Sequence, residues 1–501
     1  MKQEPGEKVL VIGAGYAGLT AAITMASYGY QVAVVEKHET TGGRGRAFSE
    51  SGFTFDMGPS WYWMPEVAEG FFNRHGRRIG DYLSLVRLDP SYQVVFGKND
   101  VVQLPASFSG ICSLFESIEK GAGSKLKIFM REAEYKYQTA MKTYINKPGL
   151  HISELCNAEV IQSVLKMDML QSFRSHASKF FKDERLLRII EFPILFLGAT
   201  ADKIPAMYSM MNYADMKLGT WYPMGGMVKL SEALTTLARE KGVHFLNGTE
   251  VTSLVVINDK VSGVDTNKGF ISADIVISGA DYHHTDRELL PVQKSNYSEE
   301  YWQKRVMAPS CLIYYIGVNR KLPGLLHHNL FFEHDLQQHA TAIYKTSTWP
   351  SHPLFYLCCP SKTDISVAPE GMENLFYLIP TAPGLADTPE IRERYLKMLL
   401  SETELFCGES FEKDIIYSRS YAYSNFIEDY HAFKGNAYGL ANTLGQTSFL
   451  KPSIRHKRIK NLFFTGQLTV PGPGVPPAIL SGEMVAHHIL KQKSVKHEIF
   501  I

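Results

Sequence analysis

The hydrophobic positions near the N-terminus predict a strand, a helix and a second strand in close succession. Residues 9–12 are four consecutive aliphatic residues, which is typical of a strand buried on both faces of a parallel sheet. A helix is expected from about 19 to 28, and a second strand at 32–35 ends in Glu36. The run from Val9 to Val35 carries no charge, but this pattern explains it better than a membrane span does.

Later segments predict further strands and helices. Apolar residues recur at helical spacing from 227 to 237, and Lys241-Gly242 ends that helix. Buried or half-buried strands are predicted at 243–246, 251–257, 261–264 and in the run that ends at Gly279. Near the C-terminus, Leu462–Phe464 indicates a buried strand, and a helical pattern over 478–486 follows a stretch rich in glycine and proline.

Three glycines between the first strand and the first helix form the motif G-x-G-x-x-G. Gly13 permits the tight turn, Gly15 lets the backbone approach a pyrophosphate, and Gly18 allows close packing of helix on strand. Ala17, beside Gly18, belongs to the same predicted contact set. Glu36 lies where an acidic residue accepts the ribose hydroxyls. Together these elements predict a dinucleotide-binding site.

The residues that follow favour FAD over a nicotinamide cofactor. Gly43 and Arg44 continue a second glycine-rich turn, whose arginine and backbone would wrap the second half of an extended cofactor. A further tight turn follows at Gly58-Pro59-Ser60. The flavin end then needs a helix N-terminus near its pyrimidine carbonyls. The C-terminal turn and helix would supply it through the following residues: Gly466, Gln467, Gly474, Val475 and Pro476.

Composition and charge exclude several classes of function. The 501 residues carry 52 basic and 51 acidic side chains, so no basic face for nucleic acid is expected. None of the six cysteines forms a C-x-x-C pair, which argues against a zinc knuckle or a thioredoxin-type site and fits a reducing cytosol. We expect neither a signal peptide nor a transmembrane helix.

Several other residues have side chains of the types that bind metals, undergo redox reactions or contact substrates. Adjacent histidines occur at His283-His284, His327-His328 and His487-His488, but neighbouring side chains diverge, so no metal site is predicted. Cys358-Cys359 is interpreted as an inert strand end, and Arg46 as part of a solvated ion pair. The aromatic stretch 60–65 suits either core packing or contact with a polyene substrate. No motif for a nucleophile elbow or catalytic triad is present, and no catalytic side chain is predicted.

The motifs together resemble those of a known family. Val9–Glu36, Gly42–Arg46, Asp56–Ser60 and the C-terminal turn, with "YPMGGMVKLSEAL", "HHNLFFEHD" and "GNAYGLANTLGQT", are similar to bacterial-type phytoene desaturases. These are carotenoid desaturases and isomerases of the amine-oxidase-like FAD superfamily. One departure is the turn Pro471–Pro477, where many relatives have small residues and a histidine, and it leaves the identity of the carotene open.

The resemblance implies an α/β fold with a Rossmann-like FAD-binding domain, a discontinuous α+β substrate domain and a helical subregion. The FAD-binding domain would comprise 1–75, 222–289 and 455–492, and the backbone of Val251 would contact adenine. The substrate domain would comprise 76–109 and 290–454. Residues 110–221 would be helical and a candidate for membrane contact. Phenylalanines there lie near basic residues and face either lipid or the domain's own core: Phe173, Phe180, Phe181, Phe192 and Phe196, with Lys166, Arg174, Lys179 and Lys182.

The implied function is desaturation of a linear or monocyclic C40 carotene by hydride transfer to non-covalently bound FAD. The alternatives are a carotene isomerase, a flavin amine oxidase on the same fold, and a non-enzymatic prenyl-lipid escort. The expected partners are a long-chain carotenoid and a membrane lipid surface, with a quinone or oxygen as electron acceptor. The expected location is the cytoplasm, at the membrane periphery.

Overall fold

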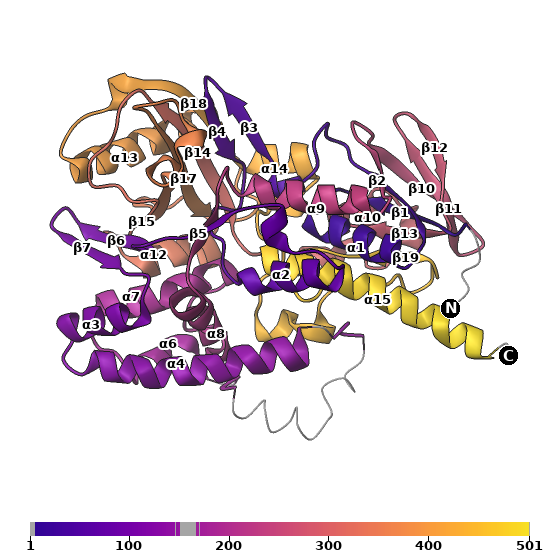
Figure 1. The fold of residues 1–501 in the computed structure, drawn as a ribbon, viewed down its shortest axis with the longest axis horizontal. Coiled ribbons are helices and arrows are strands. Elements are labelled where there is room, and N and C mark those ends of the chain that lie inside the picture. The colour runs from indigo at the N-terminus through magenta and orange to yellow at the C-terminus, as the bar shows by residue number, and fades with distance from the viewer. Residues whose placement is uncertain (1–5, 146, 151–166, 170, 500–501) are drawn as a thin grey trace.

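A five-stranded parallel sheet forms one end of the molecule. The computed structural model describes residues 6–145, 147–150, 167–169 and 171–499 (Figure 1). The strand order is β19-β13-β1-β2-β9, and every neighbouring pair is parallel. The strands come from three distant parts of the chain: β1 (Lys8–Ile12), β2 (Gln31–Val35), β9 (His244–Leu246), β13 (Ile275–Ser278) and β19 (Leu462–Phe464). The predicted Rossmann-like sheet and the α/β fold class are confirmed.

The two faces of this sheet are covered by different elements. On one face, Val9 and Val11 pack in a core with three helices: α1 (Tyr16–Ser27), α9 (Val228–Glu240) and α15 (Val475–Ile499). On the other face, Leu10 and Ile12 pack against a three-stranded antiparallel sheet: β10 (Val251–Ile257), β11 (Lys260–Thr266) and β12 (Gly269–Ser272). Burial on both faces explains the continuous aliphatic run of β1. Helix α1 begins at Tyr16, three residues before the predicted start, because Gly15 already takes the N-cap position.

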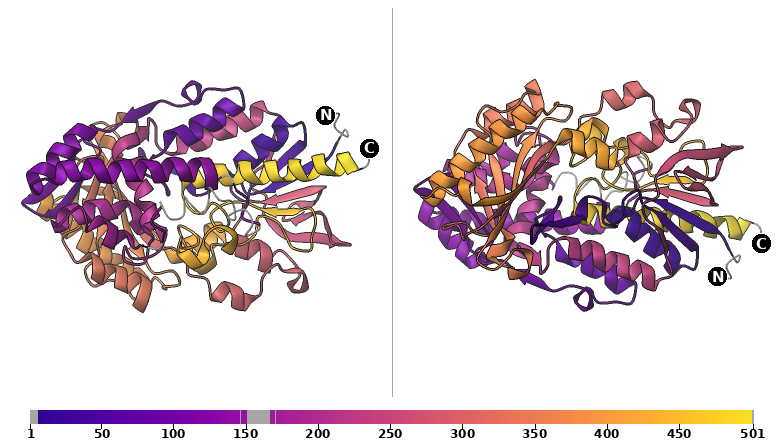
Figure 2. Two further views of the ribbon diagram at one scale, coloured as in Figure 1. Left: turned by 90° about the horizontal axis from the view of Figure 1, so that it is seen from below. Right: turned by 90° about the horizontal axis from the view of Figure 1, so that it is seen from above.

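A seven-stranded mixed sheet forms the second layer system, at the opposite end of the elongated molecule (Figure 2). Its order is β18-β14-β17-β16-β15-β6-β7, and β15 and β6 form its parallel pair. The bounds are β6 (Tyr92–Gly97), β7 (Asp100–Leu104), β14 (Ser310–Val318), β15 (His328–Phe331), β16 (Phe355–Cys358), β17 (Glu373–Thr381) and β18 (Ile415–Tyr421). Helix α13 (Pro389–Cys407) shares a core with one face of this sheet through Tyr395 and Leu399.

Two further pairs of antiparallel strands and several short helices lie outside these sheets. The pairs are β3 (Ala47–Glu50) with β4 (Phe53–Asp56), and β5 (Leu85–Arg87) with β8 (Trp221–Pro223). The α-helices outside the helical region and the cores already described are α2 (Pro65–Arg74), α10 (Tyr282–Arg287), α11 (Glu299–Gln303), α12 (Leu336–Thr341) and α14 (Tyr423–Tyr430). Phe53 and Phe55 of β4 pack in the core of the seven-stranded sheet, so β4 links the two ends of the molecule.

The helical region packs on the seven-stranded sheet. Its helices are α3 (Phe108–Ile118), α4 (Ala122–Thr139), α6 (Phe173–Ala177), α7 (Glu184–Glu191) and α8 (Met210–Tyr213). The expectation that phenylalanines of this region face lipid is wrong for Phe173, Phe181 and Phe192, which are at most 1% exposed and fill a core, and Phe180 packs partly buried against the same core. Lys166 and the side chain of Phe196 lie outside the described residues. None of the described helices combines the length and the hydropathy needed to cross a membrane.

Candidate functional site

The G-x-G-x-x-G turn lies between β1 and α1 as predicted. Gly13 has φ +90°, and a Cβ on Gly18 would lie 2.0 Å from the carbonyl oxygen of Gly13. A Cβ on Gly15, in contrast, would find only the Cα of Gly43, 4.0 Å away. Gly15 is the N-cap of α1 and makes no side-chain cap, so the first N–H groups of that helix keep their capacity to bind an anion.

The second glycine segment lies directly against the first. The N–H of Gly42 donates to the carbonyl oxygen of Ala14 at 2.8 Å, and Gly42 forms a parallel bridge with Gly15. Gly43 has φ +56°, and a Cβ there would lie 3.0 Å from the Cα of Gly15. The two glycine backbones are therefore in direct contact and carry no side chains, and backbone of this kind lets a phosphate group approach closely.

Glu36 ends β2 and is 5% exposed. Its Oε2 accepts a hydrogen bond from the N–H of Ala14 at 2.7 Å, and its Oε1 accepts one from the N–H of His38 at 3.0 Å. The carboxylate is thus fixed beside the glycine turn, and its contact with a ribose stays a prediction. Val251 opens β10 close by, since the N–H of Thr249 donates to the carbonyl oxygen of Glu36 at 2.9 Å.

Arg44 joins this segment to the C-terminal turn through Asn436. Its Nη2 donates to the carbonyl oxygen of Asn436 at 3.3 Å, and Nε2 of Gln467 donates to Oδ1 of the same asparagine at 3.0 Å. The guanidinium lies over the ring of Tyr430, 4.8 Å from its centroid, and burial lowers the Arg44 pKa. Its Nε is buried and has no hydrogen-bond partner among the described residues. Asn436 therefore links Arg44 to Gln467. It was not predicted as a site residue from the sequence, although it lies in the motif "GNAYGLANTLGQT".

The C-terminal turn and helix pack on α1. A Cβ on Gly466, which has φ +106°, would lie 3.9 Å from the Cβ of Ala17. Ser481 ties the turn together, because its hydroxyl accepts from the N–H of Gly466 at 3.0 Å and donates to the carbonyl oxygen of Val470 at 2.8 Å. Gly474 has φ +116° and precedes the first turn of α15, which begins with Val475 and Pro476. The glycine-proline stretch is therefore an ordered turn that begins a helix.

The turn Gly58-Pro59-Ser60 packs against the backbone of Arg44. A Cβ on Gly58 would lie 2.5 Å from the carbonyl oxygen of Arg44, so only glycine fits there. Ser60 lines a small cavity with Asp56 and His327, on the side of the seven-stranded sheet. The structure therefore places Ser60 farther toward the second sheet than the glycines of the other two turns.

Trp61 is the centre of an aromatic cluster between the two sheets. Its ring stacks on His328 with centroids 4.0 Å apart, and it contacts Tyr92, Phe192 and Tyr356. A second small cavity is lined by Trp61 and Tyr62 together with Val475 and Pro476 of α15. The aromatic stretch therefore packs in the hydrophobic cores and also borders the predicted flavin end of the site, and its contact with a substrate stays a prediction.

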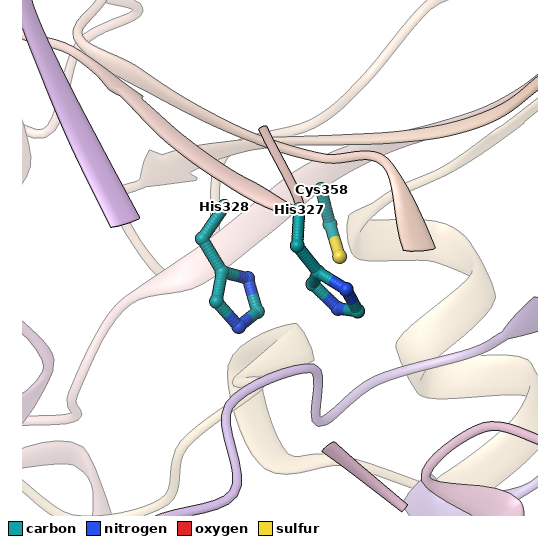
Figure 3. Close-up of side chains that lie close together, drawn as sticks. All are labelled: His327, His328 and Cys358. Atoms are coloured by element: carbon teal, nitrogen blue, oxygen red, sulfur yellow. The ribbon is translucent and has the colours of Figure 1, made fainter. Parts of the chain in front are cut away.

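The premise that adjacent histidines diverge is wrong for His327 and His328. Their ring centroids are 4.4 Å apart, and both lie beside the thiol of Cys358, with one ligand atom of each residue within 4.8 Å of the others (Figure 3). Each ring already has a hydroxyl neighbour, since Nδ1 of His327 lies 2.8 Å from Thr363 Oγ1 and Nδ1 of His328 lies 2.7 Å from the Tyr356 hydroxyl. The absence of a metal stays a prediction.

Cys358 matches its predicted role, and Arg46 matches its predicted role only in part. Cys358 ends β16, and burial raises its pKa to about 12, which agrees with an inert strand end. Arg46 pairs with Asp429 at 3.2 Å as expected, but its side chain is only 10% exposed, so this ion pair is largely buried instead of solvated.

Three features of these residues fit a flavin dinucleotide. The contact between Gly15 and Gly43 is made by backbone alone, the N-terminus of α1 has no side-chain cap, and Arg44 has a buried Nε without a partner among the described residues. The bare backbone permits close approach of a phosphate, and the helix N-terminus and Arg44 Nε offer N–H donors to the acceptor-rich groups of such a ligand.

Comparison with known proteins agrees with this geometry. Residues 16–490 match the family described as flavin containing amine oxidoreductase. The chain is 37% identical to a protein of Haloarcula japonica named carotenoid 3,4-desaturase, over 98% of this chain and 99% of that one. It is 31% identical to the zeta-carotene-forming phytoene desaturase of Myxococcus xanthus, over 97% of this chain and 94% of the relative.

The chain belongs to the flavin-containing amine oxidoreductase family. The resemblance to carotenoid desaturases is confirmed by these full-length relatives, and the protein is a flavin-dependent oxidoreductase. Among solved structures, an oxidoreductase from Methanosarcina mazei matches with a TM-score of 0.62 at 19% identity, over 97% of this chain and all 100% of that one. A putrescine oxidase matches with a TM-score of 0.62 at 15% identity, over 97% and 100%. At these identities the solved structures share the fold alone.

Proposed function

We propose that this protein is an FAD-dependent carotenoid desaturase that introduces conjugated double bonds into a linear or monocyclic C40 carotene. The observation that carries the proposal is the match over 98% of the chain to a carotenoid 3,4-desaturase at 37% identity, which spans all three turns of the candidate site. Relatives named phytoene desaturase and diapophytoene desaturase cover the chain to a similar extent.

The bound cofactor would be non-covalent FAD. The turn that contains Gly13, Gly15, Ala17 and Gly18 would hold the pyrophosphate, with Gly15 nearest to it and Gly18 packing the helix on the strand, and Glu36 and Val251 would contact the adenosine half. The flavin half would contact the residues of the remaining turns: Gly43, Arg44, Gly58, Pro59, Ser60, Gly466, Gln467, Gly474, Val475 and Pro476. The FAD-binding domain would be built from 1–75, 222–289 and 455–492, the substrate domain from 76–109 and 290–454, and the helical region from 110–221.

The chemistry needs little from acidic or basic side chains. When bound, FAD would supply a two-electron acceptor for the hydride of an allylic C–H bond, and the neighbouring carbon would release its proton to solvent as the new double bond forms. The side chains of this protein would hold the polyene in register and exclude water, because its delocalised positive charge needs no dedicated counter-ion. Trp61 and its aromatic neighbours, next to Val475 and Pro476, are well placed to line that path.

A membrane-facing surface is also part of the proposal, since a C40 hydrocarbon resides in the bilayer. Exposed residues on α4 recur at helical spacing and combine apolar with basic side chains: Lys127, Ile128, Arg131 and Tyr135. Ile128 is 46% exposed and Tyr135 is 42% exposed, and α4 forms the lower edge of the molecule in Figure 1. A helix of this pattern suits the surface of an anionic membrane. The terminal electron acceptor would be a quinone or oxygen.

Two measurements test the proposal. Acid precipitation of the purified protein should release a yellow chromophore with the mass of FAD into the supernatant, whereas colour retained in the pellet would exclude the non-covalent version. Cells that accumulate phytoene, a partly desaturated carotene or a monocyclic carotene should each be supplied with this chain. A red shift of pigment absorption with at least one substrate is expected, and no change with any of them would refute carotenoid desaturation.

A further inference from the structure

Lys451 is a buried cation whose charge the described residues do not balance. Its side chain is 4% exposed, and its Nζ has no hydrogen-bond partner among the described residues. Burial alone lowers the pKa of Lys451 to about 7. In either protonation state the amino group has N–H donors, and leaving buried donors unpaired costs free energy, so such a group calls for a ligand or partner.

A second unpartnered polar atom lies beside it. The Oδ1 of Asn442 is also buried without a partner in the described part of the chain. Both atoms lie close to Gly472, because a Cβ built there would lie 3.2 Å from Asn442 Oδ1, 3.4 Å from Lys451 Nζ and 3.6 Å from Asn442 Nδ2, and of the two amide atoms only Oδ1 is buried without a partner among the described residues. A donor and an acceptor therefore meet at one point, where the residue is a glycine.

That point belongs to the C-terminal turn. Gly472 lies two residues before Gly474 and three before the start of α15. The hydroxyl of Thr469 donates to the carbonyl oxygen of Pro452 at 2.6 Å, which binds the segment carrying Lys451 to this turn. The N–H of Asn442 donates to the carbonyl oxygen of Leu197 at 2.7 Å, which holds Asn442 against the helical region. The pair is thus fixed between the turn and its neighbours.

A ligand for Lys451 and Asn442 must accept a hydrogen bond from Nζ and donate one to Oδ1. A carotene hydrocarbon has neither a hydrogen-bond donor nor an acceptor, so it cannot satisfy an ammonium and an amide oxygen. The pyrimidine edge of a flavin has ring carbonyls beside an N–H group, which matches a donor and an acceptor placed side by side. We propose that Lys451 and Asn442 bind this edge, with Nζ donating to a ring carbonyl and Oδ1 accepting from the ring N3–H.

This inference rests on the proposed FAD site and adds two residues to it. A cation at a ring carbonyl stabilises the electron-rich reduced ring more than the oxidised ring, and thereby raises the reduction potential of the cofactor. Lys451 and Asn442 would accordingly set both the affinity for the cofactor and its potential.

The test uses the full-length protein freed of cofactor and reconstituted with FAD or with FAD methylated at N3. Wild-type protein should bind the methylated cofactor about 10-fold more weakly than FAD, as for the loss of one buried hydrogen bond with its acceptor left unpaired. Asn442→Leu should bind the two cofactors equally. Lys451→Met should lower the ratio of reduced to oxidised affinity about 10-fold, which is about 30 mV for a two-electron couple.

Lys457→Met is the matched control, because Lys457 Nζ already donates to the carbonyl oxygen of Asn296 and lies elsewhere. It should change neither the discrimination nor the potential. The cofactor-free Lys451→Met protein should also unfold at a higher temperature than the wild type, since an unpaired buried charge has been removed.

The outcomes separate this inference from the proposed function. If wild-type protein binds no FAD at all, the proposed cofactor is wrong. If it binds FAD but does not discriminate against the methylated form, and Lys451→Met behaves like Lys457→Met, the inference about the pyrimidine edge is overturned while the FAD proposal stands.

Discussion

Gly482 of α15 lies so close to Ala17 of α1 that a Cβ on Gly482 would be 2.1 Å from the Ala17 carbonyl oxygen. The same Cβ would lie 2.2 Å from Oγ1 of Thr20, which itself donates to the carbonyl oxygen of Ile479 at 3.0 Å. Glycine in the interior of a helix is less favourable than alanine by about 1 kcal/mol. Its presence here is explained by the close crossing of the two helices that carry both ends of the candidate site.

Gly482→Val should therefore separate α15 from α1. Overpacking of this kind costs about 1–3 kcal/mol or more, and we expect a lower unfolding temperature together with weaker FAD binding. Gly80→Ala is the control, because a Cβ at Gly80 meets no atom within 4 Å. Equal unfolding temperatures for the two variants would contradict the packing argument.

Two glycines of the first turn should respond differently to substitution. Gly15→Val should leave the fold stable, because a Cβ there would meet only the Cα of Gly43 at 4.0 Å, and it should abolish FAD binding, because the side chain would occupy the proposed pyrophosphate position. Gly18→Ala should destabilise the cofactor-free protein, since its Cβ would lie 2.0 Å from the Gly13 carbonyl oxygen. Thermal unfolding and a flavin fluorescence titration distinguish the two. A Gly15→Val protein that binds FAD like the wild type would show that the pyrophosphate does not lie beside Gly15.

Single substitutions of acidic residues or histidines outside the FAD contacts should not abolish desaturation. His327→Gln, for example, is expected to keep turnover within about 10-fold of the wild type, whereas a general acid or base typically contributes about 100-fold or more. Arg44→Ala and Pro476→Ala should lose far more activity, because they would shift the flavin. Turnover per bound FAD is the measurement. A fully loaded, folded Asp, Glu or His variant that loses more than 100-fold would identify a proton acceptor and refute this mechanism.

His339 should make the protein sensitive to acid. Its Nδ1 accepts from the N–H of Leu354 at 2.9 Å, its Nε2 donates to the carbonyl oxygen of Pro380 at 2.9 Å, and burial lowers its pKa to about 4. The unfolded chain, with an ordinary histidine pKa of about 6.5, binds the proton more readily. Stability from this group is therefore present above about pH 6.5 and is lost as the pH falls toward 4.

The size of this effect can be measured by chemical unfolding at pH 7 and pH 5. Between these values the wild type should lose about 2 kcal/mol more than His339→Gln. Other titrating groups, such as Glu191, whose pKa burial raises to about 7, cancel in this difference. The same loss in both proteins would mean that His339 is not held neutral in the fold.

The exposed stripe of α4 should carry the attachment to membranes. Wild-type protein should float with anionic liposomes, and replacement of Ile128 and Tyr135 by glutamate should abolish flotation without lowering the unfolding temperature, because both side chains are exposed. Glutamate at the buried Phe181 would unfold the region instead. Flotation of the double variant at the wild-type level would exclude α4 as the contact surface.

The sequence alone determined the features that depend on residues close together along the chain. The aliphatic run of β1, the glycines of the first turn and Glu36 at the end of β2 all act within a strand–turn–helix unit, so their spacing is enough to predict the local geometry. The cofactor class followed from the same units, because turn chemistry depends on which backbone conformations glycine and proline allow.

Only the tertiary structure determined which side chains are buried between distant segments and which residues of those segments lie together. Phenylalanines of the helical region and the residues of α4 both show helical spacing, but which side chains are buried is set by the sheet that covers them. His327 and His328 converge because the first lies outside the strand that begins with the second. Lys451, Asn442 and Gly472 meet because hydrogen bonds from Asn442 and Thr469 hold three separate segments together, and no periodicity along the chain records such a meeting.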